Sequence, residues 1–253
     1  MNEFLTAALE ITRQASEIPR KYFRAEFNVE HKADKSPVTI ADQQTEQFIR
    51  QALQKQFPDH AIFGEEFGRG KSNSEYEWVI DPIDGTRAFV SAVPLYGMLL
   101  ALLKNEQPRL GLIRMPEIEE VYTGNCQQAW MNGKRIQCSE TTTLDSSIVY
   151  INEGEKINAH KPGLFKRLTE TGRVMRLGYD CYPHALLAAG KIDLVIDYDL
   201  KPYDYFSLIP VIEGAGGVIS DWQGDPLTMQ SKGDVVSAAS KALHAQALEL
   251  LNA

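Results

Sequence analysis

Several features that would narrow the class of protein are missing from this 253-residue chain. It has only three cysteines, Cys126, Cys138 and Cys181, without the close spacing of a disulfide framework or a zinc site, so free thiols are expected. No apolar run reaches the ~18 residues of a membrane-spanning helix. The first residues lack the basic and apolar regions of a secretory signal. We therefore expect a cytoplasmic protein with no membrane contact.

An excess of positive charge is also missing. The chain has 26 Lys and Arg against 34 Asp and Glu, a net charge of −8. This balance argues against a nucleic-acid partner and against a polybasic membrane contact. A phosphate substrate is compatible with it, because divalent cations can reverse the local sign of an acidic site. The 43% hydrophobic content is that of an ordinary globular protein.

The first part of the chain predicts two helices and a run of hairpins. Apolar residues recur at spacings of three and four over residues 2–24 and 39–57, and Pro58 follows the second segment. Asn132-Gly133 is a hairpin turn signal. An antiparallel sheet covered by the two helices is expected. Its clearest strands are predicted at residues 78–80, 95–103, 111–115 and 120–124.

After about residue 140 the pattern changes to alternating strands and helices, which indicates an α/β half. We therefore predict two sub-domains, residues 1–139 and 140–253, that share a cleft. The strands are expected at residues 147–151, 173–177, 192–196, 218–220 and 235–238, and the helices at 161–171, 182–189, 202–215 and 241–251.

The most informative segment runs from Trp78 to Thr86, with the sequence WVIDPIDGT. Asp81 and Asp84 lie where we expect the strand to end, because Pro82 opposes its continuation. Both carboxylates and the Ile83 carbonyl are hard oxygen ligands suited to Mg²⁺. The amides of Gly85 and Thr86 can bind a phosphate. On its own, the same string could be a surface turn.

Three further acids belong to segments that each have an ordinary explanation. Glu65 follows the apolar run Ile62-Phe63-Gly64, as an acid in a solvated loop would. Asp42 and Asp204 lie near helix starts, where the helix dipole favours an acid whatever its function.

Taken together, Gly64-Glu65-Glu66, Trp78 to Thr86 and Tyr203-Asp204 to Gly217 resemble the motifs of the inositol monophosphatase family, in that family's order. The resemblance covers nearly the whole chain. It implies an αβαβα sandwich and a magnesium-dependent, lithium-sensitive phosphatase that acts on a small phosphorylated metabolite. It also implies a homodimer. Two or three Mg²⁺ ions per site are expected, and Mn²⁺ would also suit the ligands.

The resemblance implies the roles of individual residues. Glu65, Asp81 and the Ile83 carbonyl would bind the first metal, and Asp81, Asp84 and Asp204 the second. Asp42 and Glu65 would serve a weaker third, and Thr86 with Glu65 would orient the attacking water. These catalytic residues would be Glu65, Thr86 and Asp42, with Gly85 and Thr86 at the phosphate. Two metal ions can activate such a water and stabilise the leaving oxygen.

Covalent phosphatase chemistry is disfavoured. The chain has no Cys-x5-Arg segment and no histidine in an Arg-His-Gly motif. Its five histidines show no metal-binding spacing and are interpreted as surface or packing residues.

Within the family, Arg87-Ala88-Phe89, Gly178 to Tyr182 and Leu200 to Asp204 are similar to histidinol-phosphate phosphatases. Histidinol phosphate carries an ammonium group and an imidazole, which extra acids near the leaving group would bind. Asp180 and Asp197 are the candidates, although both could be ordinary loop acids, and Asp197 stands where the family usually has Glu. The predicted substrate-binding set is Asp84, Arg87, Asp180, Asp197 and Asp204.

Two alternatives are kept. The first is an inositol-1-monophosphatase of broad specificity, since a neutral polyol needs only hydroxyl partners. The second is a catalytically silent homologue that acts as a scaffold or regulator. Loss of a metal ligand or of Thr86 would mark such a protein, and all these positions are intact.

Overall fold

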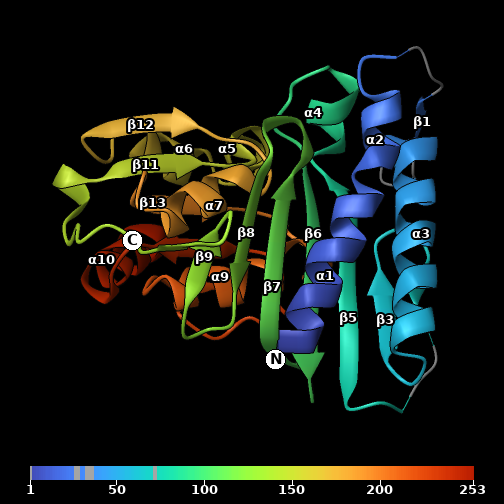
Figure 1. Ribbon diagram of the computed structural model, residues 1–253. Coiled ribbons are helices and arrows are strands. Elements are labelled where there is room, and N and C mark those ends of the chain that lie inside the picture. Colours follow the sequence, from blue (N-terminus) through green and yellow to red (C-terminus); the bar gives the residue numbers. More distant parts are fainter. Residues whose placement is uncertain (1, 26–28, 32–36, 71–72) are drawn as a thin grey trace.

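The computed structural model describes residues 2–25, 29–31, 37–70 and 73–253. The described part contains a large and a small main sheet, with helices on their faces (Figure 1). The large sheet consists of β3 (Ala61–Gly64), β4 (Gly68–Arg69), β5 (Tyr76–Asp84), β6 (Gly97–Lys104), β7 (Gln107–Met115), β8 (Glu120–Gly124), β9 (Ala129–Met131) and β10 (Lys134–Ile136). The small sheet consists of β11 (Ile148–Ile151), β12 (Val174–Leu177), β13 (Leu194–Asp197), β14 (Val218–Asp221) and β15 (Val235–Ala238). A further pair is formed by β1 (Val29–His31) and β2 (Pro37–Thr39).

Two helices, α1 (Asn2–Ala15) and α3 (Ile40–Gln56), cover one face of the large sheet (Figure 1). Their apolar stripes meet alternate residues of the central strands in one hydrophobic cluster. The start of α3 is fixed by its own sequence: the Thr39 hydroxyl accepts from the Ala41 amide, and Asp42 accepts from the Thr39 amide. Such a capping box satisfies donors that a helix start leaves unpaired.

The opposite face of the large sheet packs on helices that lie between the two sheets. These are α7 (Tyr182–Ala188), α8 (Pro202–Tyr205) and α9 (Leu208–Gly214), and their apolar residues form the largest hydrophobic cluster with both sheets. The far face of the small sheet is covered by α5 (Gly154–His160), α6 (Pro162–Thr169) and α10 (Lys241–Asn252). The resulting αβαβα layers confirm the predicted fold class.

Strand β6 shows how one sheet can serve two cores. Met98, Leu100 and Leu102 belong to the cluster under α1 and α3. The alternate residues Leu99, Ala101 and Leu103 belong to the cluster between the sheets. Because successive side chains of a strand point to opposite faces, a strand buried on both faces reads as a continuous apolar run.

Two predicted helices are each broken in two, and a proline explains both breaks. The helix predicted over residues 2–24 is divided into α1 and α2 (Glu17–Tyr22), and Pro19 lies in the first turn of α2. The helix predicted over residues 202–215 is divided into α8 and α9, and Pro210 lies in the first turn of α9. Proline has no amide to donate, and its ring collides with the carbonyl four residues earlier.

Both sheets are more mixed than predicted. The large sheet is antiparallel except that β3 runs parallel to β5. In the small sheet β11 is parallel to β12 and β13, whereas β15 is antiparallel to both β13 and β14. Helix α5 was not predicted. The sequence also favours a short strand and a loop from Asn28 to Pro37, and this segment lies partly outside the described residues. The division at residues 139 and 140 stays a prediction, and the cluster between the sheets is shared by both halves.

Pro82 led us to expect that β5 ends at Asp81, but the strand continues to Asp84. Asp81 pairs with Leu99 and Asp84 with Gly97, so the register shifts between them. A bulge tolerates Pro82 because its residues leave the regular ladder. The bulge delivers Asp84 near the end of the strand, just before α4 (Thr86–Val90).

Other expectations of the sequence hold. Cys126, Cys138 and Cys181 are free thiols. His60 stacks on Phe57 and Tyr76, and His184 is buried, as packing residues are. No helix in the described ranges is long and apolar enough to cross a membrane.

Candidate metal centre

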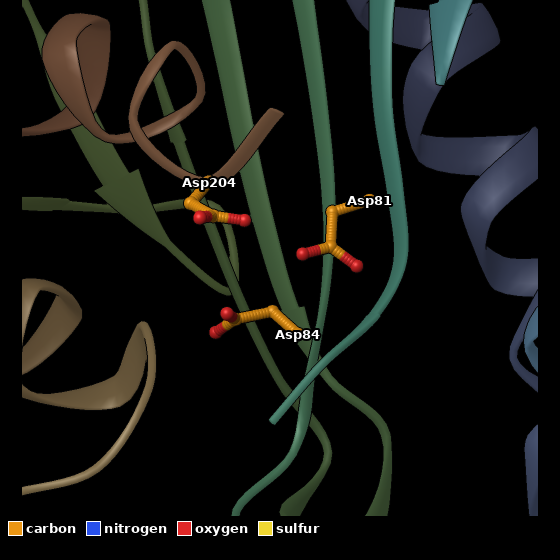
Figure 2. A group of neighbouring side chains, drawn as sticks. All are labelled: Asp81, Asp84 and Asp204. Carbon is orange, nitrogen blue, oxygen red and sulfur yellow. The ribbon is translucent and has the colours of Figure 1, made fainter. Parts of the chain in front are cut away.

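Three carboxylates converge between the large sheet and α8 (Figure 2). Asp81 and Asp84 come from β5, and Asp204 from the first turn of α8. One oxygen from each side chain lies within 4.8 Å of the others. We call Asp81, Asp84 and Asp204 the acid cluster.

The period of a strand explains why Asp81 faces α8. Val79 belongs to the cluster between the sheets, and Trp78 and Ile80 to the cluster under α1 and α3. Asp81 follows Ile80, so it projects to the same side as Val79, into the layer that contains Asp204. Its Oδ1 accepts a hydrogen bond of 3.0 Å from the Ile83 amide, which holds the carboxylate in place across the bulge.

The other two acids are oriented by backbone amides. Asp84 Oδ2 accepts from the Cys181 amide at 2.5 Å, which ties β5 to the start of α7. Asp204 Oδ2 accepts from the Lys201 amide at 2.6 Å, at the start of α8. Because each carboxylate has a fixed partner, the acid cluster is held in place from both halves of the chain.

The acid cluster is electrostatically strained. Burial raises the pKa of Asp81 well above its ordinary value, and the charges of Glu65, Asp84 and Asp204 raise it further. Burial and the charges of Asp180 and Asp204 do the same to the pKa of Asp84. Burial raises the pKa of Asp204 to about 8 despite the Lys201 amide. Clustered acids of this kind are relieved by a divalent cation, and hard carboxylate oxygens suit Mg²⁺.

Glu65 and Asp42 lie beside the acid cluster. The charge of Glu65 contributes to the raised pKa of Asp81, Asp204 and Asp42 alike, so it stands near all three. Asp42 is buried, and burial raises its pKa to about 6 although Thr39 donates to it. Glu65 and Asp42 are therefore neighbours of the acid cluster, but in the described part of the chain only Asp81, Asp84 and Asp204 form a group that could hold one ion.

Thr86 links Asp42 to the bulge of β5. Its hydroxyl lies 3.4 Å from Asp42 Oδ1 and 3.3 Å from the Ile83 carbonyl, with geometry to donate to either. Gly85, just before α4, has φ of 87°, which favours glycine. A Cβ at Gly85 would also overlap the Asp180 carboxylate, so this acid lies directly over the turn.

The two predicted leaving-group acids lie in different surroundings. Burial raises the pKa of Asp180 to about 7, with contributions from the charges of Asp197 and Glu153. Asp197 is only 1% exposed, and its oxygens accept from Asn152 at 2.6 Å and from the Tyr198 amide at 2.8 Å. His184 Nε2 lies 3.1 Å from the same carboxylate. Asp180 can therefore contact a substrate directly. Asp197 is instead buried among its own hydrogen-bond partners.

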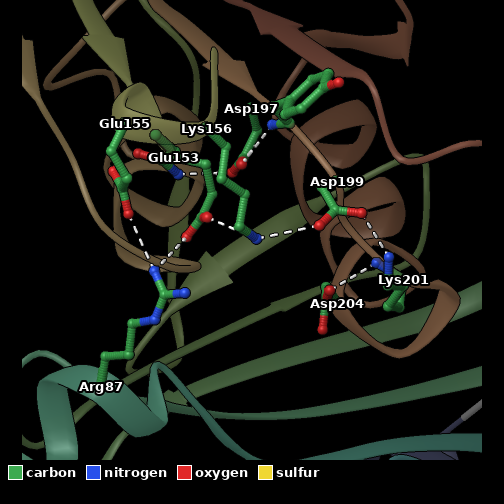
Figure 3. A network of polar contacts seen from close by, with 10 residues as sticks. Arg87, Glu153, Glu155, Lys156, Asp197, Asp199, Lys201 and Asp204 are labelled. Carbon is green, nitrogen blue, oxygen red and sulfur yellow. Dashed lines mark hydrogen bonds and ion pairs between the residues drawn. The ribbon is translucent and has the colours of Figure 1, made fainter. Parts of the chain in front are cut away.

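A chain of ion pairs borders the site from α4 to α8 (Figure 3). We call its six members, Arg87, Glu153, Glu155, Lys156, Asp199 and Lys201, the paired network. The N–O distances are 3.0 Å for Arg87–Glu155, 2.7 Å for Lys156–Glu153, 3.1 Å for Lys156–Asp199 and 2.6 Å for Lys201–Asp199. Arg87 thereby reaches from α4 to Glu155 in the first turn of α5.

Two residues near the site were missed by the sequence analysis. His184 was interpreted only as packing, yet it joins Ser237 to Asp197 through its two ring nitrogens. Glu46 is completely buried on α3, one turn after Asp42 and one turn before Ile49. The sequence offered a signal for Glu46, which is an acid at a helix position that faces the core. Glu is almost never fully buried without a partner, so such a position indicates a buried hydrogen-bonding role.

Comparisons with known proteins agree with this geometry. The profile of the inositol monophosphatase family matches residues 1–253. The bifunctional phosphatase IMPL2 of Arabidopsis thaliana is 39% identical over 99% of this chain and 75% of its own length. A histidinol-phosphatase of Chlorobaculum parvum is 37% identical over 94% of this chain and 93% of its own length. The structure of an inositol monophosphatase from Zymomonas mobilis superposes with a TM-score of 0.90 at 35% identity, covering 100% of this chain and 98% of that one.

The fold and the acid-lined site define a phosphoric monoester hydrolase. The chain belongs to the inositol monophosphatase family. This family is generally metal-dependent, and the acid cluster is a group of side chains that can hold a metal ion. The predicted resemblance and enzyme class are confirmed.

Proposed function

We propose that this protein is a magnesium-dependent phosphatase of histidinol phosphate. The observation that carries the metal part is the acid cluster, whose three carboxylates lie within 4.8 Å of one another. The substrate part is supported by Asp180 over the Gly85 turn and by the similarity to the histidinol-phosphatase of Chlorobaculum parvum.

The ligand roles are those that the family resemblance implies. Glu65, Asp81 and the Ile83 carbonyl would hold the first Mg²⁺, and the acid cluster would hold the second. Asp42 and Glu65 would hold a weaker third. When bound, the ions supply positive charge to the attacking water and to the leaving oxygen.

Thr86 orients the attacking water. A hydroxyl has one proton, so Thr86 donates either to Asp42 or to the Ile83 carbonyl and keeps lone pairs for a water. Asp42, with a pKa of about 6, is mostly ionised at neutral pH and keeps the hydroxyl turned toward it. Glu65 would orient the same water together with Thr86, and the amides of Gly85 and Thr86 would hold the phosphate.

The leaving group lies toward Asp180. An ammonium group there offsets the repulsion that Asp180 experiences from Asp197 and Glu153. Asp197 acts through the buried hydrogen bonds of Asn152 and Tyr198. Arg87 pairs with Glu155 and so defines the outer edge of the leaving-group site.

A second candidate substrate is inositol 1-phosphate. The inositol monophosphatase of Zymomonas mobilis shares this fold at 35% identity. The metal ligands would serve both substrates equally, because they act on the phosphate. The two substrates differ in the leaving group alone, where inositol brings hydroxyl groups and no charge.

One assay tests the proposal. Phosphate release from histidinol phosphate and from inositol 1-phosphate is measured in parallel, with Mg²⁺ and after EDTA. We expect no release in EDTA, recovery with Mg²⁺, and a higher kcat/KM for histidinol phosphate. Full activity in EDTA would refute the metal chemistry, and preference for the inositol ester would move the protein to the second candidate.

Several attributes stay predictions: a homodimer, a cytoplasmic location, lithium inhibition, and activity with Mn²⁺. The native mass in solution tests the first. Inhibition by millimolar lithium tests whether Asp204 belongs to the second metal site.

A further inference from the structure

The turn between β3 and β4 carries Glu65 and is tied to a carboxylate outside the acid cluster. We call residues 65–67 the Glu65 turn. Glu46 of α3 is completely buried beneath it. Its Oε2 accepts a hydrogen bond of 2.7 Å from the Glu66 amide, and its Oε1 accepts one of 3.2 Å from the Phe67 amide.

The other end of the Glu65 turn is attached to β5. The Glu65 amide donates to the Ile80 carbonyl at 3.2 Å, and Ile80 immediately precedes Asp81. Three successive amides are therefore anchored, the first on β5 and the next two on Glu46. Because these amides fix the peptide planes on both sides of Glu65, the direction of its side chain depends on both anchors.

Arg50 completes the support. Its Nε donates to Glu46 Oε1 at 2.7 Å, one helical turn along α3. Its Nη2 donates to the Gly68 carbonyl, just beyond the Glu65 turn. A buried carboxylate needs such a partner, and this one also holds the loop.

Gly64 leaves room for the carboxylate. A Cβ at this position would overlap the carboxylate group of Glu46. The glycine of Gly64-Glu65-Glu66 is therefore required by the close approach of Glu46, not by an unusual backbone angle. The motif and the buried acid form one unit.

We propose that Glu46 is a positioning residue that holds Glu65 in the direction from which it reaches the cation beside Asp81. This inference rests on the proposed magnesium chemistry of the same site. Groups that orient metal ligands change metal affinity by about 10- to 100-fold when removed.

The test is Glu46→Gln in the full-length chain. The glutamine oxygen can accept from one amide, but its NH₂ group cannot accept from the other. The affinity for Mg²⁺, measured by calorimetry, should fall about tenfold. The amides of Glu66 and Phe67 should also exchange faster with deuterium in metal-free protein.

Glu77→Gln is the matched control. Glu77 is a nearly buried glutamate that forms two hydrogen bonds with Arg69, at 2.6 and 2.7 Å. It lies at the beginning of β5, away from Asp81. Its loss should lower thermal stability but change the Mg²⁺ affinity by less than about twofold, because its hydrogen bonds are made to Arg69 and not to the Glu65 turn.

The outcomes are distinct. Glu46→Gln with wild-type Mg²⁺ affinity and wild-type exchange at Glu66 and Phe67 would make Glu46 a fold residue only and overturn the proposal. A wild-type protein that binds no Mg²⁺ would refute the proposed function instead. If Glu46→Gln does not fold, Arg50→Lys keeps the charge and loses the bond to Gly68. It should shift both readouts in the same direction, and no shift would overturn the proposal.

Discussion

The acid cluster and the paired network are neighbouring groups of charged side chains, and the pKa values of their acids are shifted in opposite directions. In the acid cluster, burial raises the pKa of all three carboxyl groups, and the charges of neighbouring acids raise it further. In the paired network, burial also raises the pKa of Asp199, but hydrogen bonds from Lys201 and Lys156 outweigh it and leave the pKa below its ordinary value. Acidic residues alone therefore do not identify a metal site. A metal site is indicated by fixed acids that repel one another and have no positively charged partner among them.

The largest expected effect is that of Asp84→Asn. The variant keeps an oxygen for the Cys181 amide but loses a charged ligand. Activity should fall at least about a hundredfold while the protein stays folded, because metal ions supply several kcal/mol of transition-state stabilisation. Phosphate release and thermal melting check both points. Asp199→Asn, in the paired network, should keep most of the activity, and equal losses in the two variants would remove the distinction.

Next comes Thr86→Ala, whose neighbour Arg87 belongs to the paired network. We expect kcat to fall by up to about a hundredfold with little change in KM, since orientation of the water matters mainly in the transition state. Arg87→Gln should instead raise KM for histidinol phosphate. Steady-state kinetics separates the two. A rise in KM alone for Thr86→Ala would make Thr86 a phosphate-binding residue.

Asp180 lies between the two groups, and Asp180→Asn should affect one substrate more than the other. A charge-assisted hydrogen bond contributes about 1.5–3 kcal/mol, so kcat/KM for histidinol phosphate should fall roughly ten- to a hundredfold. A neutral ester should lose much less. Asp197→Asn disturbs buried hydrogen bonds and should lower both rates alike. Equal losses on both esters in Asp180→Asn would contradict a cationic leaving group.

The smallest effect concerns stability against pH in metal-free protein. The folded pKa of Asp204 is about 8 and that of Asp180 about 7, whereas an unfolded Asp titrates near about 3.9. The folded protein thus holds protons that the unfolded chain has released. The stability they contribute is complete below pH ~4 and is lost as pH rises toward ~8.

Between pH 5 and 8 the melting temperature of the metal-free protein should therefore fall. Mg²⁺ should reduce this slope by replacing the protons. Scanning calorimetry with and without Mg²⁺ checks both statements. A melting temperature that rises across this range without metal would contradict the raised pKa values.

Local signals in the sequence predicted much of the fold and the site. The apolar spacing over residues 39–57 identified α3, and turn and strand patterns identified most of the large sheet. Pro19 and Pro210 offered the signal for the two broken helices, but the apolar period was given more weight. The parallel pairing of β3 with β5 depends on contacts between distant segments, which no local pattern encodes.

The site shows the same division. Asp81, Asp84 and the other acids followed from motifs. The burial of Asp197 among Asn152 and His184 did not, because it depends on how β11, α7 and β13 meet. The role of Glu46 needed the position of the Glu65 turn above α3. Motifs thus predicted the candidate metal-binding acids. The residues that orient these acids could be identified only from tertiary contacts.

The acid cluster also bears on the order of events during folding. Asp81 and Asp84 are neighbours in β5, whereas Asp204 comes from α8, about half the chain later. Closing such a long loop is slow and entropically costly, so the complete ligand set exists only after α8 has docked on the large sheet. Unlike the metal of a zinc finger, a cation at this site cannot nucleate the fold. A cation that needs all three acids would instead bind late in folding, after α8 has docked on the large sheet.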